Sequence, residues 1–269
     1  MQPPSYLYGT AWKEDATESC VALALAAGFR GIDTANQRKH YHEEGVGRGI
    51  AQWLKSGGTR EQLYLQTKFT FRDGQDQRLP YDETAPIATQ VAQSFELSLV
   101  HLGITHLDSL VLHGPSQGGT LGPLDHEAWR AMEALVDAGR VGVIGVSNIS
   151  TGQLSQLLAF AKIKPTHVQN LCYARTAWDQ MTRRLCTQHA ITYQGFSLLT
   201  ANKQVLANKD VEKICVRHGK TPSQVVFRFA QQIGMLPLTG TTNPTHMRED
   251  LDLRFDLSAD ELAIIEDAG

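Results

Sequence analysis

Residues 28–35 read GFRGIDTA, and residues 36–47 continue as NQRKHYHEEGVG. The first segment is typical of a short buried strand, because its apolar positions follow glycine and end at the acid Asp33. The second segment begins as a polar loop that carries Tyr41 and ends in the first turns of a helix. A buried strand followed by a polar loop and a helix is how a barrel enzyme presents reactive side chains, so this stretch predicts a barrel.

Helical and strand patterns alternate from one end of the chain to the other. Apolar residues recur at helical spacing in residues 17–27, and Gly28 follows where a C-terminal cap belongs. The run Thr221-Pro222-Ser223-Gln224 predicts another helix start, because it combines a capping hydroxyl, a proline in the first turn and a glutamine three residues on. The other buried strands are predicted at residues 6–8, 63–69, 108–113, 141–148, 166–170, 191–196 and 235–238.

This alternation favours one fold over its main competitor. About eight strands are separated by helices, and no linker is long enough to divide the chain, which predicts a single α/β domain, a (β/α)8 TIM barrel over residues 1–269. A doubly wound sheet would carry the pattern G-x-G-x-x-G after a strand, and no predicted strand is followed by it. The usual dinucleotide-binding turn is therefore missing.

Composition and charge exclude several classes of partner. The chain has 269 residues, of which 42% are hydrophobic, and its formal net charge is −3. Lysine and arginine are scattered without a basic run, so we expect no binding to nucleic acid or to an anionic membrane surface. We expect a small-molecule partner, and a chain that acts as a monomer or a weak homo-oligomer.

Neither the cysteines nor the apolar segments indicate a secreted, membrane or metal-binding protein. The 4 cysteines form no C-x-x-C pair and no Cys/His cluster with zinc spacing, so we expect reduced thiols and no metal. No apolar run approaches the roughly twenty residues of a membrane span, and residues 1–4 (MQPP) carry no signal-peptide pattern. We therefore expect a cytoplasmic protein.

Polar residues of reactive types stand where the predicted strands end: Asp33, Lys68, His113, Ser147, Asn148 and Gln169. In a barrel these strand ends meet at one rim, which is where active sites lie. A tyrosine hydroxyl is a poor acid unless a lysine stabilises its phenolate and an aspartate orients that lysine. A histidine beside them can donate a hydrogen bond to a substrate carbonyl oxygen. By spacing alone, however, Asp33 as a strand-end cap and Lys68 as a surface charge are the simpler interpretations.

The order of several short motifs resembles the aldo-keto reductase superfamily over nearly the whole chain. The motifs are Gly9-Thr10-Ala11-Trp12, Asp33-Thr34-Ala35, the segment from Tyr41 to Gly47, Thr67-Lys68, Leu112-His113-Gly114-Pro115, Gly145-Val146-Ser147-Asn148 and Gln169-Asn170. Each motif is weakly specific, but their order and spacing together are strongly so. The resemblance implies a nicotinamide-dependent oxidoreductase that reduces aldehydes or ketones to alcohols by hydride transfer.

The resemblance also implies the residues of the site. The catalytic residues would be Asp33, Tyr41, Lys68 and His113, with Tyr41 as general acid toward the carbonyl. The cofactor would be NADPH, the family's default, or NADH, extended across the rim; Ser147, Asn148 and Gln169 would hold its carboxamide. The full set of implied cofactor contacts is Thr10, Asp33, Ser147, Asn148, Gln169, Phe196, Ser197, Leu199, Thr239, Gly240, Thr241, His246 and Asp250. Trp12, Tyr41 and His113 would line the substrate pocket, and Phe196 would stack on the nicotinamide.

The loop that leads to Tyr41 departs from the family pattern. Between Asp33 and Tyr41 it is about two residues longer than usual, and in the segment His40-Tyr41-His42 a shift of one residue would put a histidine at the position of the acid. We predict Tyr41 as the acid, because a histidine would need a different proton-transfer chemistry.

Two further departures concern the cofactor and the pocket. The family's Lys-Ser pair and following Arg, which bind the 2′-phosphate of NADP, appear here as Gly240-Thr241 and His246. The loss of fixed cations should weaken discrimination for a phosphate, unless Asn243 or Arg248 compensates. The chain ends soon after Leu257, so we expect an open pocket without the family's long C-terminal loop.

Other interpretations of these residues stay open at this point. Ser147-Asn148 suits an N-terminal helix cap as well as carboxamide binding, and Phe196 suits a core position as well as a stacking partner. The same scaffold also suits a non-catalytic, nicotinamide-binding regulatory subunit, or a Schiff-base aldolase that uses Lys68. The intact set of four catalytic residues argues against the regulatory subunit, and borohydride trapping of a Lys68 adduct would favour the aldolase.

Overall fold

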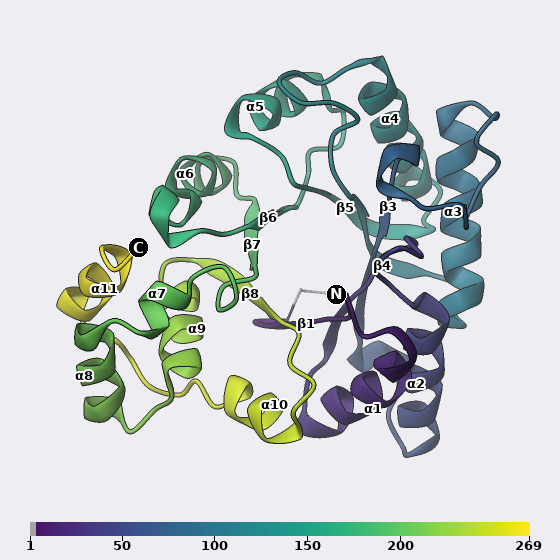
Figure 1. Cartoon of the computed structure of the whole chain (residues 1–269). Coiled ribbons are helices and arrows are strands. Elements are labelled where there is room, and N and C mark those ends of the chain that lie inside the picture. Colours follow the sequence, from purple (N-terminus) through teal and green to yellow (C-terminus); the bar gives the residue numbers. More distant parts are fainter. Residues whose placement is uncertain (1–3) are drawn as a thin grey trace.

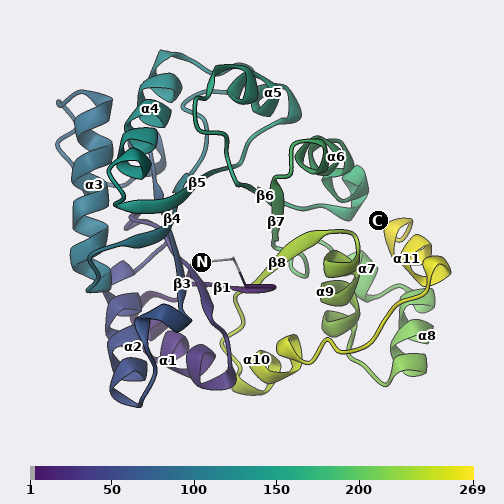
Figure 2. The ribbon, with the colours of Figure 1, turned by 180° about the vertical axis from the view of Figure 1, so that it is seen from behind.

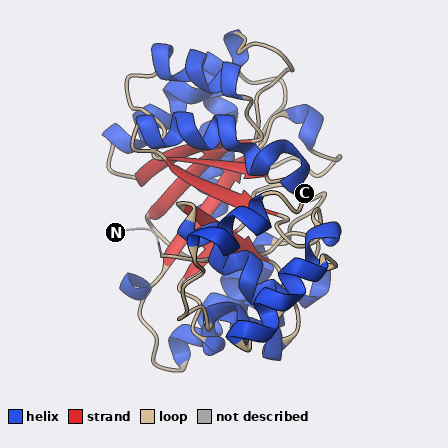
Figure 3. Ribbon diagram, turned by 90° about the vertical axis from the view of Figure 1, so that its left-hand side faces the viewer, coloured by secondary structure: helices blue, strands red, loops and turns tan. Residues whose placement is uncertain are grey.

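The computed structural model describes residues 4–269, which form a closed barrel of parallel strands in the order β1 to β8. Figure 1 shows the strands at the centre of the molecule, and Figure 3 shows them from the side between layers of helices. The strands are β1 (Leu7–Gly9), β2 (Gly31–Asp33), β3 (Tyr64–Phe69), β4 (Leu107–Leu112), β5 (Val141–Ser147), β6 (His167–Leu171), β7 (Thr192–Phe196) and β8 (Met235–Thr239). The predicted (β/α)8 barrel is confirmed.

Helices follow the strands and surround the barrel, as two opposite views show (Figure 1, Figure 2). The helices that follow the first six strands are α1 (Thr17–Ala27), α2 (Glu43–Lys55), α3 (Ile87–Leu102), α4 (Pro123–Asp137), α5 (Thr151–Phe160) and α6 (Gln180–Gln188). The later helices are α7 (Lys203–Leu206), α8 (Lys209–His218), α9 (Pro222–Gln232), α10 (Pro244–Leu251) and α11 (Ala259–Glu266). Short 3-10 turns lie at Glu14–Ala16, Arg60–Gln62, Arg72–Gly74 and Ala174–Asp179.

Local capping signals placed several helix ends correctly. Gly28 follows α1 with a φ of 118°, and its N–H bonds to the carbonyl of Ala24, as a left-handed C-terminal cap requires. The hydroxyl of Thr221 accepts a hydrogen bond from the N–H of Gln224, and α9 begins at Pro222. Helices α7, α8 and α10 were not predicted; α7 and α10 are short, whereas α8 carries Val211, Ile214 and Cys215 at helical spacing, a signal that was missed.

Strand bounds differ from the predicted ones by a residue at several ends. The first strand begins at Leu7, because the buried Tyr6 lies just before the ladder and packs edge-on against Phe29 and Phe227, with ring centres 5.7 and 5.2 Å apart. Strand β4 ends at Leu112, so His113 is the first residue of the next loop. The predicted strand ends differ from the observed ones because some apolar residues next to a strand are buried but make no hydrogen bonds of the sheet.

The core has two parts that the strands separate. Large apolar side chains fill the space between strands and helices; Trp129, Trp178 and Phe95 are among the fully buried ones. Inside the barrel, Leu7, Tyr64, Leu236 and Leu238 form a separate apolar cluster. Polar side chains also lie in the interior, and Gly145 leaves room for one of them, because a Cβ there would meet the ring of His167 at 2.2 Å.

Of residues 1–4, which show no signal-peptide pattern in the sequence, residues 1–3 lie outside the described residues. Within residues 4–269, no helix is both long enough and apolar enough to cross a membrane.

Candidate functional site

A buried ion pair lies at the rim where β2 and β3 end. The Lys68 ammonium donates to Asp33 Oδ2 at 2.6 Å and to the carbonyl of Thr34 at 2.8 Å. The two side chains are 0% and 4% exposed, respectively. Burial lowers the pKa of Lys68, and the Asp33 carboxylate opposes that shift. The pair therefore holds a desolvated ammonium in one place, which is not the surface charge that spacing alone suggested.

Glutamine side chains hold the other oxygen of Asp33. The amides of Gln66 and Gln169 donate to Asp33 Oδ1 at 2.7 and 2.9 Å. Gln194 accepts from both glutamines, at 2.9 and 3.0 Å. The side-chain hydrogen bonds that fix the carboxylate thus come from β3, which neighbours β2, and from β6, which does not. Because buried polar groups are stable only when satisfied, this network specifies one orientation of Asp33.

Tyr41 lies beside the ion pair and His40 does not. The Lys68 nitrogen is 5.3 Å from the centre of the Tyr41 ring, and the His113 ring is 5.9 Å away, nearly edge-on. His40 lines the same cavity, but its ring packs on Trp12, with ring centres 3.9 Å apart. The sequence offered two neighbouring residues, His40 and Tyr41, as the one beside Lys68. In the structure that residue is Tyr41.

The longer loop before Tyr41 is held by a second loop. The Gln37 amide donates to the carbonyl of Gly74 at 2.6 Å, and the Gln75 amide donates to the carbonyl of Asn36 at 2.9 Å. Within the first loop, the N–H of Tyr41 bonds to the Gln37 carbonyl at 3.0 Å. The extra residues therefore form a pinned turn that still delivers the Tyr41 side chain to the strand ends.

Two titratable groups at the rim are biased toward their neutral forms. Burial and the negative charge of Asp33 raise the pKa of the Tyr41 hydroxyl, so the phenol stays protonated. Burial and the positive charge of Lys68 lower the pKa of His113 well below its usual range, so the imidazole stays neutral near pH 7. The rim therefore carries one fixed ammonium between a phenol that can donate a proton and a neutral imidazole.

A cavity of about 730 Å³ runs from this rim over the ends of the strands. One end is lined by Trp12, Tyr41 and His113, and the other end by the segment after β8. Most of the implied site residues line it: Asp33, Ser147, Asn148, Gln169, Phe196, Ser197, Leu199, Thr239, Gly240, Thr241, His246 and Asp250. An elongated cavity of this kind suits an extended ligand with a reacting group near Tyr41.

The middle of the cavity fits a carboxamide. Ser147 ends β5, and Asn148, with a φ of 52°, begins the next loop. Helix α5 is capped by Ser150, so neither of these residues serves as its cap. Gln169 Oε1 and Asn148 Oδ1 accept no hydrogen bond from the described residues, although both side chains line the cavity. Two unused acceptors beside the Phe196 ring match the donors of a nicotinamide carboxamide.

The far end of the cavity has few fixed cations. His246 and the carboxylates of Glu249 and Asp250 line it, whereas Arg248 and Asn243 do not. Lys13 also lines the cavity, and its ammonium donates to the carbonyl of Gly240 at 2.7 Å, at the start of this segment. This end therefore suits neutral hydroxyls better than a second phosphate.

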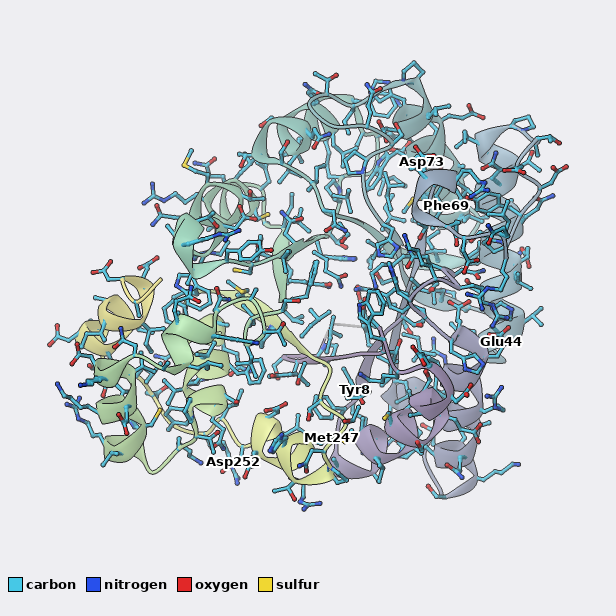
Figure 4. The ribbon with its side chains drawn as sticks, viewed as in Figure 1. Tyr8, Glu44, Phe69, Asp73, Met247 and Asp252 are labelled. Carbon is cyan, nitrogen blue, oxygen red and sulfur yellow. The ribbon has the colours of Figure 1, made fainter. Side chains whose placement is uncertain are left out.

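Sequence reasoning missed Lys13 and misplaced Thr10 relative to the cavity. Lys13 directly follows Trp12 in the sequence, and only this position could have indicated that it lines the cavity. Tyr8 of β1, which Figure 4 labels, lies with its ring centre 5.2 Å from the Lys13 ammonium and donates to the carbonyl of Thr241 at 2.9 Å. Thr10 does not line the cavity, because its hydroxyl donates to the carbonyl of Asp33 at 3.0 Å.

Asp250 gives this end of the cavity a pH dependence. Burial raises the pKa of Asp250 to about 6, although the Thr239 hydroxyl donates to its carboxylate at 2.7 Å. Because the pKa of Asp250 is higher in the folded state than its ordinary value of 3.8, the protonated carboxyl stabilises the fold. This stabilisation is complete below pH 3.8 and is lost as the pH rises through about 6. Asp250→Asn should therefore raise the free energy of unfolding at pH 8 by roughly 1–3 kcal/mol and change it little near pH 4, in urea titrations.

Asp252→Asn is the matched control for that experiment. Asp252 is an exposed carboxylate whose pKa is lowered by the hydrogen bond from Lys220. Its neutralisation should lower stability at pH 8 slightly, opposite in sign to Asp250→Asn. If Asp250→Asn were equally stabilising at pH 4 and pH 8, the gain would not come from titration of this carboxyl.

Within residues 4–269, no group of three or more His, Cys, Asp or Glu side chains is placed to hold a metal ion. The four cysteines are buried thiols.

Comparisons with known proteins identify the family of this chain. The model of the aldo/keto reductase family matches residues 7–269. Two proteins of Bacillus subtilis (strain 168) are similar: the uncharacterised oxidoreductase YtbE, 30% identical over 99% of this chain and 89% of its own, and glyoxal reductase, 32% identical over 94% and 83%. The solved structure of an aldo/keto reductase from Brucella melitensis is 28% identical, with a TM-score of 0.83 over 99% of this chain and 95% of that one. The chain belongs to the aldo/keto reductase family, whose members are NAD(P)H-dependent oxidoreductases.

Proposed function

We propose that this protein reduces small aldehydes or ketones to alcohols, with NADPH or NADH as cofactor and Tyr41 as general acid. The observation that carries the proposal is the position of Tyr41, which lines the cavity with its ring 5.3 Å from the Lys68 nitrogen and 5.9 Å from the His113 ring. Glyoxal reductase, a relative that acts on a small dicarbonyl by its name, supports this substrate class.

Each rim residue has a role that its surroundings allow. The Tyr41 phenol holds a proton and donates it to the carbonyl oxygen, and the Lys68 ammonium stabilises the phenolate that remains. Asp33 keeps Lys68 charged and oriented through the 2.6 Å hydrogen bond. His113, whose ring is 5.9 Å from that of Tyr41, orients the substrate carbonyl. When bound, the nicotinamide cofactor supplies the hydride.

The cofactor-binding part of the proposal assigns roles along the cavity. Asn148 and Gln169 bind the carboxamide with their unused acceptors, and Phe196 stacks on the nicotinamide ring. Ser197 and Leu199 lie on the loop after β7 that would pass the pyrophosphate, and Lys13 is the nearest fixed cation of the cavity wall. A cofactor bound by these residues would have its reacting carbon near Tyr41.

The direct test combines binding with turnover. Fluorescence titration with NADPH and NADH measures the cofactor site, and absorbance assays with glyoxal, simple aldehydes and ketones measure reduction. Saturable cofactor binding with reduction of at least one carbonyl class is the expected result. Cofactor binding without turnover of any carbonyl would instead indicate the non-catalytic regulatory subunit.

The structure gives the aldolase alternative little support. A Schiff base needs a neutral, accessible amine, whereas the side chain of Lys68 is 0% exposed and paired with Asp33. Borohydride should therefore trap no carbonyl adduct on Lys68, in mass spectra of the treated protein.

His246 should decide how well the enzyme separates NADPH from NADH. His246→Arg places a permanent cation at the far end of the cavity, where the 2′-phosphate would lie, so it should tighten NADPH binding about tenfold and leave NADH binding unchanged. Thr245→Arg is the matched control, because it adds the same charge at an exposed neighbour that does not line the cavity. Equal gains in both variants would mean that general charge, rather than a phosphate contact at position 246, tightens binding.

A further inference from the structure

Thr70 makes a contact that the proposed reaction has not used. It is the first residue after β3, two positions beyond Lys68. Thr70 is 6% exposed, and its hydroxyl oxygen lies 2.6 Å from Nδ1 of His113. Among the described residues, this hydroxyl has no other hydrogen-bond partner.

The contact determines which imidazole nitrogen carries the proton. A neutral imidazole has one N–H and one lone pair, and His113 is neutral because burial and Lys68 lower its pKa. If the Thr70 hydroxyl donates to Nδ1, both groups are satisfied and the proton of His113 sits on Nε2. If Nδ1 donates instead, the buried hydroxyl proton has no acceptor, which costs about 1–3 kcal/mol. The first arrangement is favoured.

Both partners are held so that the contact persists. The carbonyl of Thr70 accepts from the Tyr81 hydroxyl at 2.8 Å and from the Gln75 amide at 3.4 Å. The N–H of His113 bonds to the carbonyl of Phe69 at 2.9 Å, and its own carbonyl accepts from the Asn148 amide at 2.8 Å. Backbone contacts on both sides therefore fix the distance between the hydroxyl and Nδ1.

We propose that Thr70 is a positioning residue that keeps the proton of His113 on Nε2, so that the imidazole offers a hydrogen-bond donor to the substrate carbonyl beside the Tyr41 hydroxyl. With Nδ1 engaged by Thr70, Nε2 is the nitrogen left for the cavity that His113 lines. A donor there stabilises the charge that develops on the carbonyl oxygen, whereas a lone pair would repel it. The kinetic part of this inference rests on the proposed carbonyl reduction; the tautomer itself does not.

The test compares Thr70→Val, which removes only the hydroxyl, with Thr70→Ser, which keeps it. Nitrogen–proton correlation spectra of 15N-labelled protein report the tautomer, and His113→Gln identifies the His113 signals. We expect the Nε2–H tautomer in the wild type and in Thr70→Ser, and a mixture of tautomers in Thr70→Val. The kcat of Thr70→Val should fall about tenfold, the loss expected for one hydrogen bond, with an unchanged Kd for NADPH.

Melting temperatures separate a folding defect from a positioning effect, since all three proteins should unfold within a few degrees of one another. A pure Nε2–H signal in Thr70→Val, or a Nδ1–H signal in the wild type, would overturn the inference. A wild type that shows the Nε2–H tautomer but reduces no carbonyl would instead count against the proposed function, so the two failures are distinguishable.

Discussion

Tyr41→Phe is expected to lower kcat by about 10²- to 10⁴-fold, the usual contribution of a positioned general acid, while the Kd for NADPH stays nearly the same. The variant keeps the ring that stands 5.3 Å from the Lys68 nitrogen and 5.9 Å from the His113 ring, and loses only the hydroxyl. Steady-state assays and fluorescence titration of the same preparation measure both quantities. Normal reduction rates in Tyr41→Phe would show that another group supplies the proton.

His40→Gln is the informative control, because His40 is the other candidate in this register. Its ring packs on Trp12 with a centre distance of 3.9 Å, and both residues line the cavity in which we propose that the substrate binds. We therefore expect a raised KM and a kcat within about tenfold of the wild type. If His40→Gln lost most of its kcat while Tyr41→Phe stayed active, the general acid would be His40 and not Tyr41.

Lys68→Met is expected to abolish turnover and also to destabilise the protein by about 3–5 kcal/mol, since it leaves the Asp33 carboxylate buried without its counter-charge. The loss in kcat should be at least about 10²-fold, because the phenolate of Tyr41 would have no ammonium to stabilise it. Urea unfolding and steady-state kinetics measure the two effects.

The double variant Asp33→Asn/Lys68→Met separates stability from catalysis. It removes both charges, so most of the lost stability should return while activity stays absent. Lys162→Met is the matched surface control: Lys162 pairs with Asp137 at 2.9 Å, but both side chains are more than half exposed, so its loss should change stability by less than about 1 kcal/mol. Full activity in the double variant would rule out the proposed role of the ion pair.

Much of the site was predictable because the residues stand at the ends of strands. Asp33 is the last residue of β2, Ser147 the last of β5, and His113 follows β4 directly, so a parallel barrel brings them to one rim. That inference needs only the number and order of the strands. Thr10, which the family resemblance and not the strand ends implied as a cofactor contact, donates its hydroxyl to the main-chain carbonyl of Asp33.

The choice between Tyr41 and His40 depended on contacts between loops. The loop before Tyr41 takes its shape from the hydrogen bonds of Gln37 and Gln75, whose partners in each case lie in the other loop, more than thirty positions away. No periodicity encodes such contacts, because loop residues are not repeated on a buried face. For the same reason, nothing in the sequence pointed to the Thr70 hydroxyl as the partner of His113, 43 residues away.

The sequence alone was thus sufficient to establish a parallel barrel with Asp33, Lys68 and His113 at one rim, because alternating burial patterns encode the strands and their ends. Only the tertiary structure decided that Tyr41 rather than His40 faces Lys68, that glutamines from two other strands orient Asp33, and that Thr70 contacts His113. The physical reason is that burial is a property of each residue's own position in a repeating element, whereas the direction of a loop side chain is set by hydrogen bonds to residues far away in the chain.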